Sequence, residues 1–255
     1  MNTVKVRNLI IGEGMPKICV PVTGCSKEAI IEEIVCIKEL PADLIEWRAD
    51  WYEYVFDADE LMSILKDIRE AAENIPVLMT FRTRREGGEK DVDAGTYSRI
   101  VTRAISSGCI DLVDVELFVG DDTVSFLISE AHAAGVKVVA SNHDFEKTPA
   151  RDEIIARLCR MQAVGADISK IAVMPQSKHD VLTLLEATEE MNRRYADRPV
   201  IAISMGSDGL ISRLAGEVFG SAVTFGAGTN ASAPGQIRAD NLKNVLNIIH
   251  GIRDR

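Results

Sequence analysis

Two short apolar runs each hold one side chain that can transfer a proton. The run VVASNHDF contains His143, and the run DISKIAVMP contains Lys170, 27 positions further along the chain. That separation is enough for a strand, a helix and the return to a neighbouring parallel strand. A lysine buried in such a run should have a lowered pKa and a nucleophilic amine. The pair therefore predicts imine chemistry, with a histidine moving protons beside the amine.

Each of these two residues also has a purely structural interpretation. Lysines are seldom buried, and Lys170 opens the predicted strand 170–174, so it could be a surface residue just before that strand. His143 could be a strand-end histidine that its neighbours cap. The other histidines fall in helical patterns without the spacing of metal ligands, so no metal site is predicted.

The elements that must position these residues alternate along the chain. Eight short apolar runs predict strands that are buried on both faces, and helical patterns lie between them. Eight such repeats in 255 residues are typical of a (β/α)8 barrel, and we expect one barrel domain over residues 1–255. The expected strands are 17–22, 43–48, 76–82, 111–116, 136–141, 170–174, 199–204 and 222–226. The expected helices are 27–38, 58–74, 97–106, 124–134, 152–164, 178–194, 210–217 and 236–249.

The main alternative is a doubly wound open sheet. That fold would need fewer strands for this length or a second domain, and no linker is visible. The N-terminal segment TVKVRNLIIGEG alternates loosely between apolar and polar residues and ends in Gly-Glu-Gly. It predicts a β-hairpin that covers one end of the barrel.

Polar residues gather at the expected carboxyl ends of the strands, where barrel enzymes place their active sites. These residues are Glu46, Arg48, Arg82, Glu116 and His143. Arg213, in the helical pattern after the seventh strand, could face the same pocket. Residues 226–236 (GAGTNASAPGQ) have the small residues expected of a lid, which includes Ser232 and Gln236. Residues 226–231 of the lid also match GxGxxA, a pattern of dinucleotide-binding loops. No later strand could carry the acidic residue that binds the ribose, so no dinucleotide is predicted.

Composition narrows the class of partner. The formal net charge is −10, with acidic and basic residues interspersed, which argues against nucleic acid because phosphates need a basic face. An anionic substrate must therefore meet local arginines. No signal peptide or apolar span of about 18 residues is visible, so we expect a cytoplasmic protein without a membrane partner. The five cysteines are dispersed without a CxxC, and we expect reduced thiols in the core.

The chain resembles the type I 3-dehydroquinate dehydratase family, the Schiff-base enzymes of the shikimate pathway. The stretches that carry the resemblance are NLIIGEGMPKI, EWRAD, TFRTRREGGE, SNHDF, KIAVMPQSKHDVLTLL, SRLAGEVFGSAVTFG and ASAPGQ. They run in the family's order from near the N-terminus to the final helix. The resemblance implies a (β/α)8 barrel and a homodimer that needs no metal or cofactor. It also implies dehydration of 3-dehydroquinate to 3-dehydroshikimate, a step of chorismate and aromatic amino acid biosynthesis.

The resemblance further implies a role for each site residue. Lys170 falls on the family's imine-forming lysine, His143 on its general acid/base, and Glu86 on the acidic partner of that histidine. The substrate-binding positions are occupied by Glu46, Arg48, Arg82, Arg213, Ser232 and Gln236. Some bacterial members have a serine at the end of the first strand, where this chain has Pro21. A proline offers only its carbonyl there, and we expect a small effect on binding and none on the chemistry.

In the implied mechanism, Lys170 forms an imine at C3 of the substrate. His143 then removes a C2 proton and protonates the departing C1 hydroxyl. Arg213 would hold the carboxylate, and Ser232 and Gln236 would close over the ring. Two alternatives remain open from the residues alone. One is a class I aldolase, whose phosphate site could come from residues 204–209 (SMGSDG). The other is a barrel that binds a metabolite without turning it over.

Overall fold

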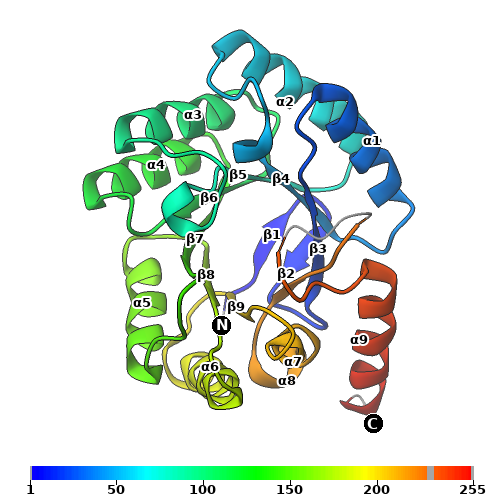
Figure 1. Ribbon diagram of the computed structural model, residues 1–255, viewed down its shortest axis with the longest axis vertical. Coiled ribbons are helices and arrows are strands. Elements are labelled where there is room, and N and C mark those ends of the chain that lie inside the picture. Colours follow the sequence, from blue (N-terminus) through cyan, green and yellow to red (C-terminus); the bar gives the residue numbers. More distant parts are fainter. Residues whose placement is uncertain (1, 229–232, 254–255) are drawn as a thin grey trace.

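Eight parallel strands form the centre of the structure, a computed structural model that describes residues 2–228 and 233–253 (Figure 1). Neighbouring strands hydrogen-bond in the order β10-β3-β4-β5-β6-β7-β8-β9. A single bridge between Val200 and Ser221 joins the last seam, between β9 and β10, so the sheet is a nearly closed barrel. The predicted (β/α)8 architecture is confirmed. The strands are β3 (Lys17–Val22), β4 (Leu44–Arg48), β5 (Val77–Thr80), β6 (Leu112–Glu116), β7 (Lys137–Asp144), β8 (Ile168–Val173), β9 (Val200–Ser204) and β10 (Val223–Phe225).

Helices surround the barrel and bury their apolar faces against it (Figure 1). Capping side chains set several helix starts: Ser26, Asp57 and Asp93 accept backbone N–H groups of the first turn, and Ser177 begins a capping box. The helices are α1 (Lys27–Lys38), α2 (Ala58–Ala72), α3 (Ala94–Ser106), α4 (Asp121–Ala133), α5 (Arg151–Ala163), α6 (Lys178–Glu190), α7 (Leu210–Leu214), α8 (Gly216–Phe219) and α9 (Ala239–Arg253). Two short 3-10 turns are η1 (Ala49–Trp51) and η2 (Arg84–Glu86).

Several predicted helices differ from the structure: those predicted to begin at residues 97 and 124 begin three residues earlier, at Ala94 and Asp121. The pattern 178–194 is α-helical only to Glu190, after which the chain forms the π-helical turn η3 (Met191–Tyr195). The pattern 210–217 breaks at Ala215 into α7 and α8. The last helix begins at Ala239 rather than at residue 236, because Ile237 is still held by a backbone hydrogen bond from Ala227.

The observed strand boundaries place both His143 and Lys170 differently from the prediction. The strand predicted at 136–141 continues as β7 to Asp144, so His143 lies within the strand and not after it. The strand predicted to begin at Lys170 begins at Ile168, so Lys170 is its third residue. Lys170 is 3% exposed, and its interpretation as a surface residue is therefore wrong. Pairing between β7 and β8 holds the additional residues of both strands in the sheet, and β9 pairs with β8 on its other side.

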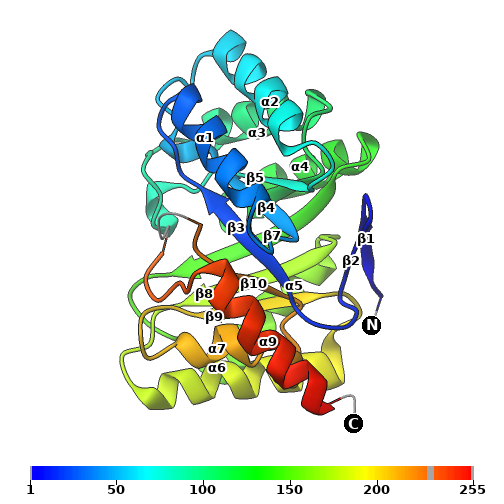
Figure 2. The ribbon, with the colours of Figure 1, turned by 90° about the vertical axis from the view of Figure 1, so that its right-hand side faces the viewer.

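The N-terminal hairpin covers the end of the barrel at which the strands begin (Figure 2). It consists of β1 (Val4–Val6) and β2 (Leu9–Ile11), which pair antiparallel as predicted. Its turn is tied to the barrel by an ion pair of 2.6 Å between Arg7 Nε and Asp111 Oδ1. Its apolar side chains share a buried cluster with the first inward residues of five strands: Leu44, Leu78, Leu112, Val139 and Ile168.

The cysteines do not all lie in the core. Cys19 is buried, whereas the other four are exposed or half-buried, so the prediction of core thiols is wrong for those four. A partly exposed cysteine has no characteristic sequence pattern, so these thiols could not be distinguished from buried ones in the sequence. All five are free thiols. No described helix is long and apolar enough to cross a bilayer.

Candidate active site

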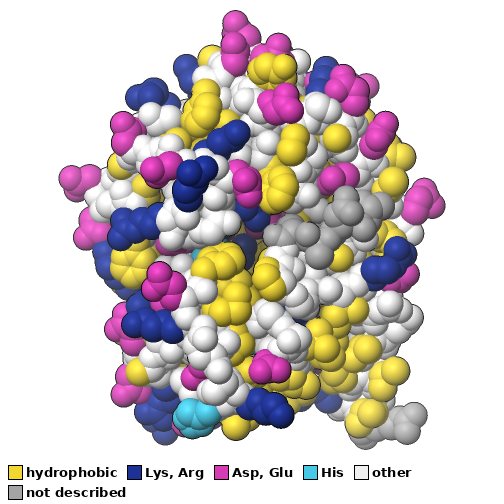
Figure 3. Space-filling view, in the orientation of Figure 1, with side chains coloured by type: hydrophobic (Ala, Val, Ile, Leu, Met, Phe, Trp, Pro, Cys, Tyr) yellow, Lys and Arg dark blue, Asp and Glu magenta, His cyan; other side chains and the backbone are white. Residues whose placement is uncertain are grey.

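A cavity of about 620 Å³, counted with its open mouth, lies at the carboxyl ends of the strands. Figure 3 views this face of the molecule, on which acidic and basic side chains are interspersed around hydrophobic ones near the centre. Eight of the nine predicted site residues line the cavity: Glu46, Arg48, Arg82, Glu86, His143, Lys170, Arg213 and Gln236. The ninth, Ser232, lies outside the described residues, as does most of the central part of the predicted lid. Ala233 and Gln236, from its end, reach the cavity.

Strand alternation places the polar residues in layers. Inward side chains recur at every second residue of a strand. Each of β4 to β8 contributes one buried, inward-facing apolar residue to the cluster under the hairpin. The next inward residue is polar in every one of these strands: Glu46, Thr80, Asp114, Ser141 and Lys170. The reactive part of the site therefore rests on a closed apolar floor.

Lys170 is held between two carboxylates. Its Nζ lies 3.2 Å from Glu46 Oε1 and 3.7 Å from Asp114 Oδ2. The ring of Phe225 lies beneath the amine, with its centroid 4.4 Å from Nζ. Thr80 donates a hydrogen bond of 3.0 Å to the same oxygen of Glu46. These contacts compensate for burying a cationic side chain and fix the direction in which the amine points.

His143 is anchored by Glu86 from η2. Glu86 Oε2 lies 3.0 Å from His143 Nδ1 and accepts the His143 backbone N–H at 2.9 Å. Burial and the positive charges of Arg82, Lys170 and Arg48 hold the pKa of His143 well below its usual value of 6.5. In the neutral ring, a proton on Nδ1 donates to Glu86 and leaves the Nε2 lone pair available as a base.

Glu86 is itself nearly buried, at 4% exposure. Burial raises its pKa from 4.5 to about 7; Arg82 acts against that rise and Glu116 acts with it. Glu86 Oε1 also accepts a hydrogen bond of 3.1 Å from Asn142 Nδ2. Because the imidazole and this carboxylate share a proton, they titrate as a pair.

Arg82 forms the centre of a buried ionic network. Its guanidinium contacts Asp114 Oδ2 and Glu116 Oε1 at 2.9 Å each, and Glu86 Oε2 at 3.6 Å. Burial alone would raise the pKa of Asp114, but Arg82 and Lys170, together with a hydrogen bond from Ser141, hold it below its usual value. Arg82 thus organises carboxylates as well as facing the cavity.

Arg48 is held by a neighbour in the same way. Its Nε and Nη2 atoms form a bidentate pair with Asp50 at 2.9 and 2.8 Å. Asp50 is fully buried and also accepts the backbone N–H groups of Arg82 and Glu89. The guanidinium group of Arg48 is therefore fixed at the cavity wall before any ligand binds.

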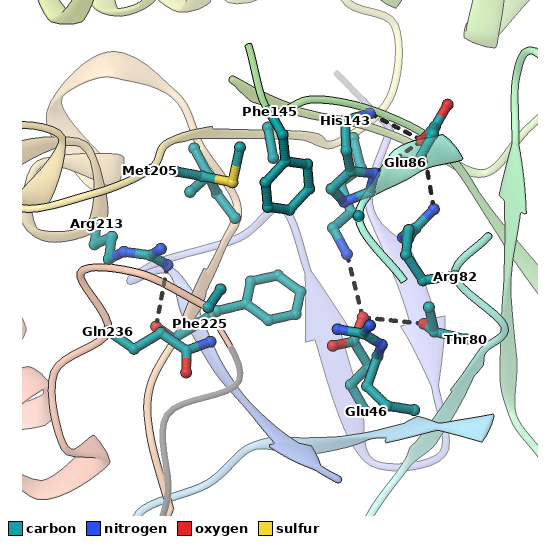
Figure 4. Close-up of a pocket in the computed structure, with 16 residues that line it drawn as sticks. Glu46, Thr80, Arg82, Glu86, His143, Phe145, Met205, Arg213, Phe225 and Gln236 are labelled. Atoms are coloured by element: carbon teal, nitrogen blue, oxygen red, sulfur yellow. Dashed lines mark hydrogen bonds and ion pairs between the residues drawn. The ribbon is translucent and has the colours of Figure 1, made fainter. Parts of the chain in front are cut away.

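Arg213 lies across the cavity from Glu86 and Arg82 (Figure 4). It is 2% exposed, and its Nη atoms donate to the carbonyl oxygens of Phe225 and Pro234 at 3.4 and 3.2 Å. Within the described residues no carboxylate pairs with it, and its Nε is buried without a hydrogen-bond partner. Burial lowers the pKa of Arg213 to about 10, so it still carries its charge at neutral pH.

Two groups of site residues were not predicted from the sequence. Asp114, Thr80 and Ser141 were assigned to strands without a role, although the alternation in LVDVE already places two carboxylates on one face. The apolar wall was missed because its members read as ordinary core: Phe145, Ile203, Met205 and Phe225. Among the described residues, no cluster of His, Cys, Asp and Glu could hold a metal ion.

The whole chain is similar to one family of known proteins. The sequence model of the type I 3-dehydroquinase family matches residues 18–253. The 3-dehydroquinate dehydratase of Bacillus velezensis is 52% identical over 250 residues, which is 98% of this chain and 99% of that protein. The enzyme of the same name from Clostridioides difficile is 51% identical over 247 residues, 97% of each chain.

A solved structure gives the same result in three dimensions. It is the type I 3-dehydroquinate dehydratase from Clostridium difficile with covalently modified comenic acid. The two structures superpose with a TM-score of 0.96 at 50% sequence identity, over 98% of this chain and 99% of that chain. These similarities exclude the aldolase that the sequence alone left open.

Proposed function

The chain belongs to the type I 3-dehydroquinase family and is a hydro-lyase that dehydrates 3-dehydroquinate in the shikimate pathway, and we propose that it does so through an imine on Lys170. His143 is the general acid/base in this proposal, and Glu86 is the group that orients it. One observation carries the assignment. The buried amine of Lys170 and the imidazole of His143, on neighbouring strands, line the same cavity.

The proposed reaction begins at the C3 ketone of the substrate. Lys170 gives up one proton and its neutral amine adds to that carbon; the adduct then takes a proton back and loses water, which leaves a protonated imine that withdraws electrons from C2. Nε2 of His143 takes a proton from C2, which leaves an enamine. The same imidazole then gives a proton to the C1 hydroxyl, which departs as water while the C1–C2 double bond forms. Hydrolysis of the conjugated imine releases 3-dehydroshikimate and restores the amine.

The positive charge of Arg213 supports a role as the clamp for the substrate carboxylate. A planar guanidinium can bind a carboxylate through two parallel hydrogen bonds, and Arg213 has no carboxylate partner among the described residues. It stands across the cavity from Glu86 (Figure 4), so a substrate held there would present its ring to Lys170 and His143.

Other residues complete the proposed substrate site. We assign recognition of the ring hydroxyls to Glu46, Arg48 and Arg82, whose directions are fixed by contacts with Thr80, Asp50 and Glu116, respectively. Gln236, together with Ser232 outside the described residues, would close over the ring and exclude water. The chemistry needs no metal or cofactor, because the imine itself is the electron sink.

We also propose that the enzyme is a homodimer that works in the cytoplasm. The family resemblance implies both, and five free thiols fit a reducing compartment. Sedimentation equilibrium should then give twice the mass of one 27.9-kDa chain. A single-chain mass across the micromolar range would contradict the dimer.

Reductive trapping tests the imine directly. Borohydride added with 3-dehydroquinate should leave a stable adduct on the peptide that contains Lys170. The Lys170→Ala variant should give no adduct and no turnover. The His143→Ala variant should still be trapped, while its turnover falls by about 10²-fold to 10⁴-fold, as expected for lost acid–base catalysis. An adduct on a different lysine would defeat the assignment of Lys170, and near wild-type turnover of His143→Ala would defeat that of His143.

A further inference from the structure

Asn142 lies between the Glu86–His143 pair and the surrounding helices. It precedes His143 in β7, and because consecutive strand residues point to opposite faces, its side chain leaves the barrel where that of His143 enters it. Asn142 Nδ2 donates to Glu86 Oε1 at 3.1 Å. Its Oδ1 accepts a hydrogen bond of 2.9 Å from Arg157 Nη1 on α5. Only 5% of Asn142 is exposed.

These two partners fix which way the amide points. A guanidinium only donates hydrogen bonds, so the atom of Asn142 facing Arg157 must be the carbonyl oxygen. The NH₂ group must then face Glu86. The reverse orientation would set the amide NH₂ against Arg157 and its oxygen against a carboxylate, which loses both hydrogen bonds.

The orientation of the Asn142 amide affects the ring tautomer of His143 through Glu86. Glu86 receives hydrogen at Oε1 from Asn142 and at Oε2 from the His143 backbone N–H, and these donors favour its ionised form. Above its raised pKa of about 7, Glu86 is ionised and can only accept at Oε2, so His143 must then hold its ring proton on Nδ1. Nε2 is then left as the base.

We propose that Asn142, held by Arg157, is a positioning residue that keeps Glu86 an acceptor and His143 in the Nδ1–H tautomer. The link runs from α5 on the outside of the barrel to the reacting atoms without touching the substrate. The importance of the tautomer for turnover rests on the proposed role of His143 as the base. The hydrogen-bond chain itself does not depend on that role.

Other charged groups act on the same pair and must be kept constant in any test. Arg82 and Glu116 face Glu86, while Arg82, Lys170 and Arg48 act on His143. On α5, Arg157 also binds Glu153 through Nε at 2.8 Å. Apart from Arg157, none of these groups is changed in the test.

The chain offers a matched control on the same helix. The guanidinium groups of Arg157 and Arg160 both lie over the ring of Phe118, at 5.6 and 5.4 Å from its centroid. Within the described residues only Arg157 reaches Asn142. Arg157→Gln and Arg160→Gln therefore remove the same charge and the same ring contact, but only the first removes the support of the amide.

Steady-state kinetics give the first readout. Asn142→Ala and Arg157→Gln should lower kcat by about 10-fold to 100-fold with KM changed less than about twofold, by analogy with the loss when a partner that orients a metal-bound histidine is removed. Arg160→Gln should match the wild type. Asn142→Asp puts a like charge beside Glu86 and should raise the apparent pKa of the acid limb of kcat/KM by about one unit or more.

Nitrogen NMR of the resting enzyme gives the second readout and needs no turnover. At a pH well above 7, where Glu86 is ionised, spectra of ¹⁵N-histidine-labelled enzyme should show the Nδ1–H tautomer in the wild type and in Arg160→Gln; the His143 signal is assigned from His143→Gln. Asn142→Asp, which can no longer donate to Glu86, should lose that single tautomer. Circular dichroism and thermal melts confirm that each variant folds, and Arg157→Gln serves if Asn142→Ala does not.

The outcomes separate the two proposals. Wild-type kcat and an unchanged tautomer in Asn142→Ala and Arg157→Gln would overturn the inference, even if His143→Ala is inactive. Equal losses in Arg157→Gln and Arg160→Gln would also overturn it. If His143→Ala turns over normally, the proposed function fails, whereas a shifted tautomer in Asn142→Asp would still establish the positioning.

Discussion

The site balances buried charges residue by residue. Lys170 is paired with Glu46 and Asp114, and Arg82 is paired with Asp114 and Glu116. Such pairs stabilise little in themselves, because desolvation offsets the attraction, but removing one partner strands the other at a loss of about 3–5 kcal/mol. We therefore expect the ionic network to hold geometry more than to add stability.

The Glu86–His143 pair predicts a pH dependence with a definite sign. The pKa of Glu86 is raised to about 7, so the pair takes up one proton as the pH falls through neutrality. Whether that proton resides on Glu86 or on the imidazole, Nε2 no longer has a free lone pair. The acid limb of kcat/KM should therefore have an apparent pKa near 7.

Glu86→Gln tests this interpretation. An amide cannot take up the proton, so the acid limb should move to lower pH, towards the lowered pKa of His143 itself. Activity at the plateau should fall as well, because the ring is less firmly oriented. The measurement is kcat/KM from pH 5 to 9, followed by the ultraviolet absorbance of the conjugated product. An acid limb that stays in place or moves to higher pH would contradict the pairing.

Substitution of Arg213 should weaken substrate binding and leave the chemical steps largely unchanged. Arg213→Gln should lower kcat/KM by about 10-fold to 100-fold, the equivalent of a charged hydrogen-bond pair, mostly through KM. Arg213→Lys should recover only part, because an ammonium cannot form two parallel bonds. A carboxamide analogue of the substrate should bind equally to wild type and Arg213→Gln. If the variant discriminates acid from amide as strongly as the wild type, the clamp lies elsewhere.

At the scale of elements, the alternating strand pattern accounts for most of what could be predicted. Runs such as DLIEWR and PVLMTFR indicated both the strands and their polar ends, so Glu46, Arg48 and Arg82 were placed at the cavity from sequence. The start of β8 was missed because Ser169 is polar, and a polar residue at a strand start resembles a loop. In the barrel its hydroxyl is buried against the carbonyl of Leu158.

Contacts between distant segments could not be predicted from the sequence pattern. Asn142 bonds Glu86, which is 56 positions away, and Lys170 bonds Glu46 across 124 positions. Such contacts depend on the shear and closure of the barrel, which no local pattern encodes. The family resemblance assigned Glu86 to His143, but neither it nor the pattern indicated Asn142 or Asp114.

The hairpin predicts a difference between two neighbouring isoleucines of β2. Ile11 is fully buried under the barrel floor, whereas Ile10 is 40% exposed on the other face of the same strand. Ile11→Ala should lower the free energy of unfolding by about 2–5 kcal/mol, and Ile10→Ala by less than about 1 kcal/mol. Urea titrations measure both. Equal losses would mean that the hairpin does not seal the barrel.

At the scale of the whole molecule, the site is assembled from both halves of the chain. Glu46, Arg82 and Glu86 come from the first half, and His143, Lys170 and Arg213 from the second. The barrel is completed when β10 pairs with β3, which joins the two ends of the sequence. The second half alone would leave Lys170 without its carboxylates, Glu46 and Asp114, which both lie in the first half. We therefore propose that residues 1–255 fold as one cooperative domain.

Unfolding monitored in each half separately tests this proposal. Both tryptophans, Trp47 and Trp51, lie in the first half, so their fluorescence follows that half alone. Tyr195→Trp, at a half-exposed position of η3, adds a reporter in the second half when Trp47 and Trp51 are replaced by Phe. Both signals and the far-ultraviolet circular dichroism should then show one urea midpoint. Separate midpoints for the two reporters would mean that the halves fold independently, and that the buried Lys170–Glu46 pair does not couple them.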